Sequence, residues 1–156
     1  MNTASQFKTF TFFLCLICFS FTGCHFNSRN INSDEDKNDA EKITKEFYDL
    51  LKKADYVKTY KLFGKNFFVA TDTSKLNDLF ITTNEKLGPI ESMELGEWET
   101  IVVTGTDAKS DYALQYIVKH EKFEAKETFR LTKENGQIKI VGYNVNSDGF
   151  FARDKK

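Results

Sequence analysis

Cysteine is scarce in this chain, and none lies beyond Cys24. The other two, Cys15 and Cys18, stand in the same N-terminal segment. Everything after residue 24 therefore has no disulfide, no thiol nucleophile and no thiolate ligand for a metal. Histidine is equally scarce, because His120 is the only one after residue 25, and a zinc site built from several histidines or cysteines is excluded as well. We expect no metal and no cofactor.

Other signatures of catalysis and of nucleic-acid binding are also missing. The chain has no glycine-rich phosphate loop and no spacing of serine, histidine and aspartate that indicates a triad. Lys and Arg number 22 against 23 Asp and Glu, a net charge of −1. This balance argues against nucleic acid as a partner, because such binding needs a basic face. Glu91, Glu94, Glu97 and Glu99 resemble calcium ligands in composition, but strand geometry divides them between two faces.

The longest apolar run is near the start of the chain. Residues 11–22 read TFFLCLICFSFT, and Lys8 is the only charged side chain before them. The run is shorter than the about 20 residues that a membrane-spanning helix needs. It matches the hydrophobic region of a secretory signal, which is about 7–15 residues long. We expect residues 1–23 to be a signal peptide.

The four residues Phe21, Thr22, Gly23 and Cys24 end this segment. They resemble the lipobox of bacterial lipoproteins, in which a small residue and then Gly or Ala precede the cysteine; Phe21 stands where Leu is usual. The resemblance implies cleavage between Gly23 and Cys24, with a lipid such as diacylglycerol or palmitate on Cys24. An ordinary secreted protein cut nearby and an uncleaved anchor are the alternatives. With the lipid, the partner of the chain is a membrane of the cell envelope.

Residues 24–38 (CHFNSRNINSDEDKN) are rich in Asn, Ser and acidic side chains. A segment with so few large apolar residues cannot bury enough surface to order itself, so we expect a flexible tether. The acidic run at residues 34–36 is either a solvated linker or a surface-export signal. His25 stands where an aspartate favours retention at the inner membrane in enteric bacteria, so an outer membrane is favoured if the cell has one.

The folded domain is expected to span residues 39–148, with a C-terminal tail at 149–156. Helical spacing starts at Asp39, which can cap the first helix. Asp55 can cap a second short helix that Gly64 ends, and a third helix runs from about residue 73 to Gly88 and Pro89. The apolar positions of the first helix are Ile43, Phe47, Leu50, Leu51 and Ala54.

After Pro89 the apolar period changes to two, which predicts strands. The first strand changes phase near Gly96, and a bulge there would reconcile the two phases. Residues 111–119 and 123–131 alternate cleanly, and residues 137–145 form the last strand. Asn135 and Gly136 between the last two strands are a strong signal for a two-residue hairpin. Helices followed by a four-stranded antiparallel meander make an α+β fold.

The C-terminal hairpin carries a Gly-Tyr pair in the stretch FRLTKENGQIKIVGYNV, residues 129–145. Together with the order of elements over residues 39–148, it resembles exported bacterial domains of the cystatin-like or nuclear-transport-factor-two-like superfamily. The resemblance implies N-terminal helices packed on a strongly curved sheet of four strands, a cone with a concave face. It carries no diagnostic catalytic motif.

The hairpin predicts which side chains face one another. With a loop at Asn135 and Gly136, Leu131 faces Ile140, Phe129 faces Gly142, and Glu127 faces Asn144. A preceding turn at residues 121–122 places Tyr116 on the other side of Glu127. The row Tyr116, Glu127 and Asn144 would cross the concave face, where a carboxylate needs partners because a bare buried charge is very costly.

This row has two interpretations, the polar floor of a ligand pocket or a self-satisfied structural network. His120 is expected to lie exposed at the hairpin turn, without a role. We expect a non-catalytic envelope module that binds a small ligand or an envelope protein, with no catalytic residue assigned. The alternatives are a pocket enzyme that uses Glu127 as acid or base, and a structural lipoprotein of an envelope complex.

Overall fold

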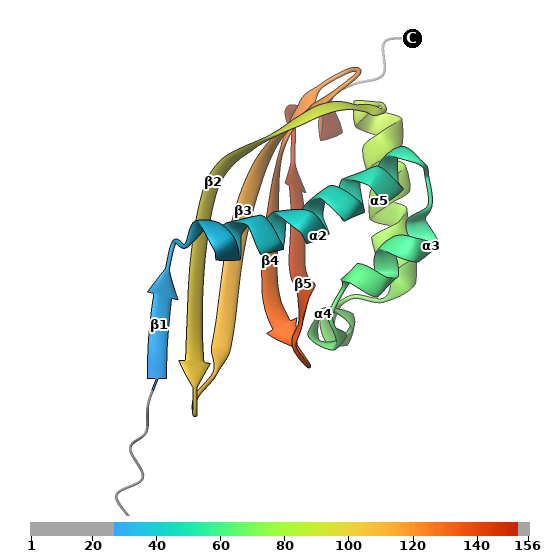
Figure 1. The fold of residues 1–156 in the computed structure, drawn as a ribbon. Coiled ribbons are helices and arrows are strands. Elements are labelled where there is room, and N and C mark those ends of the chain that lie inside the picture. The colour runs from blue at the N-terminus through green and yellow to red at the C-terminus, as the bar shows by residue number, and fades with distance from the viewer. Residues whose placement is uncertain (1–26, 153–156) are drawn as a thin grey trace, which may run out of the picture.

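The computed structural model describes residues 27–152, and it has the expected α+β order. One strand comes first, then a group of helices, then four long strands joined by hairpins (Figure 1). The elements are β1 (Asn27–Ile31), α2 (Asp34–Lys52), α3 (Tyr56–Thr59), η1 (Tyr60–Leu62), α4 (Lys65–Ala70), α5 (Thr73–Leu87), β2 (Ile90–Gly105), β3 (Lys109–His120), β4 (Glu124–Glu134), β5 (Gln137–Asn146) and η2 (Asp148–Phe150).

The sheet is open and antiparallel, with the strands in sequence order from β1 to β5. Four strands were predicted, and that number was wrong, because β1 adds a fifth strand at the edge of β2. The predicted bulge in β2 is confirmed, since its register against β3 shifts between Leu95 and Trp98. The predicted two-residue hairpin is confirmed too. Glu134 pairs with Gln137, and both Asn135 (φ 51°) and Gly136 (φ 78°) take the left-handed conformation that this turn requires.

Residues 27–38 are ordered elements of the domain, so the predicted flexible tether was wrong for this part of residues 24–38. All five residues of β1 are exposed, and the strand is held by backbone pairing with β2. Ser33 caps α2 with its side chain on the backbone N–H of Asp36, and the acidic run at residues 34–36 forms the first turn. Acidic side chains in the first turn stabilise the helix, because they interact favourably with the positive end of its dipole. Composition gave no sign of this, because neither the edge pairing nor the cap depends on apolar residues.

Residues 1–26 lie outside the described part of the chain, and with them the predicted signal peptide, Gly23 and Cys24. Residues 153–156 of the predicted tail also lie outside it, while η2 lies partly within that tail. Across residues 27–152, none of the helices combines the length and apolar character needed to cross a membrane.

One face of the sheet carries the core, and α2 runs across it (Figure 1). Phe47 of α2 is fully buried and makes edge-on contacts with rings from the helices and from the sheet, including Phe80 at 5.7 Å, Phe129 at 5.2 Å and Tyr143 at 5.0 Å. Each such pair adds about 0.5–1.5 kcal/mol to the burial of the rings. The aromatic cluster therefore fixes where α2 and α5 lie relative to β4 and β5.

Asn32 joins β1 to α2, and its conformation makes a specific substitution informative. Its φ is 51°, its backbone N–H donates to the Thr100 carbonyl at 2.8 Å, and its Oδ1 accepts from the Thr100 N–H at 3.0 Å. Asn32→Ala removes the hydrogen bond from the Thr100 N–H to Oδ1. It also leaves an alanine in the left-handed region, without the polar side chain that stabilises this conformation in asparagine. We expect urea denaturation to show a loss of about 1–2 kcal/mol. Asn30→Ala on the exposed strand β1 is the matched control and should lose about 0.5 kcal/mol or less; equal losses would contradict this role of Asn32.

Candidate functional site

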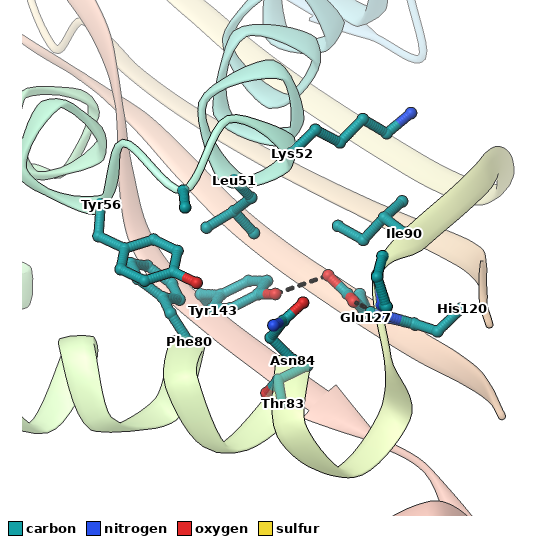
Figure 2. Close-up of a pocket in the computed structure, with 12 residues that line it drawn as sticks. Leu51, Lys52, Tyr56, Phe80, Thr83, Asn84, Ile90, His120, Glu127 and Tyr143 are labelled. Carbon is teal, nitrogen blue, oxygen red and sulfur yellow. Dashed lines mark hydrogen bonds and ion pairs between the residues drawn. The ribbon is translucent and has the colours of Figure 1, made fainter. Parts of the chain in front are cut away.

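A cavity of ≈ 340 Å³ lies between the C-terminal end of α2, helix α5 and the inner face of the sheet (Figure 2). Its lining combines apolar and aromatic side chains with polar ones, several of which lie near Glu127. The wall residues include Leu51, Ala54, Tyr56, Phe80 and Ile90, and the polar end includes Asn84, His120, Glu127 and Tyr143.

Glu127 forms the floor of this cavity. Strand β4 alternates so that Ala125, Glu127, Phe129 and Leu131 all face the helices, and the whole Glu127 residue is buried, with 0% of its surface exposed. Two tyrosine hydroxyls donate to its Oε2: Tyr48 from α2 at 3.1 Å and Tyr143 from β5 at 2.6 Å. The carboxylate thus ties one helix to two strands.

His120 completes the cluster from the end of β3. The residue is 4% exposed, its Nδ1 lies 2.8 Å from the Gly88 carbonyl oxygen, and its Nε2 lies 3.4 Å from Oε1 of Glu127. A carbonyl oxygen only accepts hydrogen bonds, so Nδ1 of His120 must carry a proton. The ring is therefore fixed in one orientation, with Nε2 towards the carboxylate.

This geometry determines where a further proton lies. If the imidazole were neutral, the lone pair of Nε2 would face a carboxylate oxygen that also has only lone pairs. Two acceptors that face each other in a buried site repel unless a proton lies between them. A hydrogen bond between Nε2 and Oε1 therefore needs one proton between the two groups.

The tyrosines around the cluster stay protonated far into the alkaline range. Burial raises the pKa of Tyr48 and of Tyr143 well above the usual value, and the nearby Glu127 carboxylate adds to both shifts. Burial also raises the pKa of Tyr116 to about 12, against a smaller opposing effect of the hydrogen bond with Thr44. The hydroxyls of Tyr48 and Tyr143 are thus permanent donors to Glu127 at neutral pH.

The predicted row Tyr116, Glu127, Asn144 is only partly assembled. Tyr116 pairs with Glu127 across β3 and β4 as expected, but its hydroxyl lies 2.6 Å from the Thr44 hydroxyl, on α2. Asn144 is exposed and pairs with Thr128, while Val145 lies opposite Glu127. The placement of Asn144 opposite Glu127 was therefore wrong, as was that of Gly142 opposite Phe129.

A bulge in the last hairpin explains this error. Leu131 pairs with Ile140 as predicted, but Arg130 pairs with Gly142, so the register shifts by one residue between them. Beyond the bulge, Tyr143 faces the core and stacks against Phe129, with ring centroids 4.9 Å apart. An unshifted register would turn this ring to the outer face and leave a glycine inside.

The expectation that His120 lies exposed at the turn was also wrong. It continues the inward phase of Tyr116 and Val118 on β3, and this alternation was a usable signal in the sequence. Tyr48 and Tyr143 were missed for different reasons. Tyr48 directly follows Phe47, so it is not one of the regularly spaced apolar positions of the predicted helix. Tyr143 points into the core only because of the bulge.

The described residues contain no group of three or more His, Cys, Asp or Glu side chains that could hold a metal ion. Comparisons with protein-family models, with curated proteins and with solved structures found no match to this chain.

The tyrosine shifts predict how stability depends on alkaline pH. A hydroxyl with a raised pKa keeps its proton in the folded state while the unfolded chain loses it above pH about 10. The contribution of Tyr116 is therefore complete below pH about 10 and is lost as pH rises towards about 12. Urea denaturation at pH of about 9, 10 and 11 should show that the free energy of unfolding declines as pH rises. In Tyr116→Phe this decline should be smaller, by at most about 1.4 kcal/mol per pH unit. An unchanged decline in Tyr116→Phe would contradict the shift.

Proposed function

We propose that this domain is a non-catalytic module that binds a small organic ligand in the cavity above Glu127. The observation that carries the proposal is the cavity itself, ≈ 340 Å³ and lined by both apolar and polar side chains. Ligand sites are usually about 300–1,000 Å³ and combine apolar walls with a few placed polar groups. Thr83 also lines the cavity, and its buried Oγ1 has no hydrogen-bond partner, which supports a polar occupant.

A pocket enzyme is the second candidate, and the contact between His120 and Glu127 favours it. Two acid–base groups that share a proton beside a cavity are a common feature of active sites. Both groups are, however, already held in place by Gly88, Tyr48 and Tyr143. Every polar atom of the pair has a structural partner, which supports the binding module over the enzyme.

The fold resembles the cystatin-like cone, with helices packed on a strongly curved sheet. The order of helices followed by an antiparallel meander supports this proposal, and so do the bulges in β2 and β5, because bulges bend a strand. A cavity between the helices and the concave side of such a sheet is where this architecture leaves room for a ligand.

The protein is anchored in the cell envelope by a lipid on Cys24, and in an outer membrane if the cell has one. The lipobox pattern of residues 21–24 supports the anchor. Strand β1 begins at Asn27, three positions after Cys24, so the tether is short. Asn27 pairs with Gly105 at one end of β2, whereas Ile90 pairs with His120 at the other end. Strand β2 spans up to roughly 50 Å, so the cavity, which Ile90 and His120 line, lies at the end of the sheet away from the proposed anchor.

The anchor is tested by labelling. Cells that express Cys24→Ala and are fed an alkyne analogue of palmitate should yield unlabelled protein, because the thiol that takes the lipid is gone. Cys18→Ala, in the expected signal peptide, is the control and should be labelled like the wild type. Label on Cys24→Ala would overturn the lipoprotein assignment. A purely structural lipoprotein without a ligand would require that the cavity binds nothing.

The cavity is tested with three aromatic probes of similar size: 2-phenylethylamine, 2-phenylethanol and 3-phenylpropionate. At least one should shift amide NMR signals of residues that line the cavity. Asn84→Trp places a large ring at the mouth, where Asn84 points towards Tyr143 and Glu127 (Figure 2), and should abolish the shifts. Thr82→Trp on the exposed part of α5 is the matched control and should keep them. If none of the three probes produces shifts in the cavity, the proposed function is wrong.

A further inference from the structure

The hydrogen-bond donors at the floor of the cavity are already used within the protein. The hydroxyl protons of Tyr48 and Tyr143 point to Oε2 of Glu127, and the Nδ1 proton of His120 points to the Gly88 carbonyl. What remains at Tyr143 is acceptor capacity, because a tyrosine oxygen keeps its lone pairs when it donates. Thr83 and Asn84, which also line the cavity, can both donate and accept. A ligand that complements the buried carboxylate and the Tyr143 oxygen therefore brings donors and a positive charge.

We propose, on the basis of the binding function above, that the cavity recognises a small organic amine. Its ammonium group would donate to the hydroxyl oxygen of Tyr143, and its positive charge would face the buried Glu127 carboxylate. Among common head groups, an ammonium has three donors and no acceptor, and its charge complements a carboxylate. An anionic head would meet the carboxylate and be repelled.

The walls of the cavity fit the remainder of such a ligand. The rings of Tyr56 and Phe80 lie 5.5 Å apart and both line the cavity, together with the ring of Tyr143. Aromatic faces attract cations and pack against aromatic or aliphatic groups. Leu51 and Ile90 add aliphatic surface. The occupant is therefore a monoamine with a compact apolar body, and Lys52 at the rim disfavours a second positive charge.

The test compares the three probes on the full domain by NMR titration at neutral pH. We expect 2-phenylethylamine to bind at least about ten-fold more tightly than 2-phenylethanol and 3-phenylpropionate, because only the amine brings a positive charge to the end of the cavity that lies over the Glu127 carboxylate.

Glu127→Gln keeps the shape of the floor and removes its charge, so the preference for the amine should fall by about ten-fold. Glu99→Gln, an exposed glutamate on β2, is the matched control and should bind like the wild type. If Glu127→Gln does not fold, the probe series on the wild type still decides the matter. Equal or stronger binding of the alcohol or the acid overturns the amine inference and leaves the binding function intact, whereas binding of no probe overturns both.

Discussion

The Glu127 carboxylate is removed from water, and a charge in such a position is stable only when several donors reach it. Those donors come from three different elements, Tyr48 on α2, Tyr143 on β5 and His120 on β3. Each element must therefore hold its position to within hydrogen-bond distance. An unpaired charge there would cost several kcal/mol, which is a large part of the stability of a domain this size. The network thus determines how α2 crosses the sheet and how β5 pairs with β4.

The bulge in β5 follows from the same constraint. Without it, the alternation that starts at Ile140 would place Gly142 inside and Tyr143 outside. With it, Tyr143 enters the core, donates to Glu127 at 2.6 Å and packs against Phe47 and Phe129. The gain of one charge-assisted hydrogen bond and two ring contacts outweighs the disruption of one step of the strand ladder. Local turn chemistry sets the register beside the turn, and the core sets it beyond the bulge.

The features that the sequence predicted correctly have local causes. The α+β order, the hairpin at Asn135 and Gly136, and the bulge near Gly96 follow from periodicity and turn residues within a few positions. The inward direction of Glu127 followed from alternation with Phe129 and Leu131. The missed features depend on contacts between distant segments. Strand β1 exists because the edge of β2 is available, about 70 residues along the chain, and composition cannot show that pairing.

The same atoms hold the fold together and form the floor of the cavity, which limits how this domain can change its ligand. Glu127, Tyr48 and Tyr143 cannot be replaced singly without leaving a buried polar group unpaired. Residues such as Asn84 and Ala54 line the cavity from exposed positions, and their replacement leaves the carboxylate network complete. Ligand size and shape can therefore vary through the rim and walls, whereas the acceptor character of the floor is retained for as long as the fold depends on the buried carboxylate.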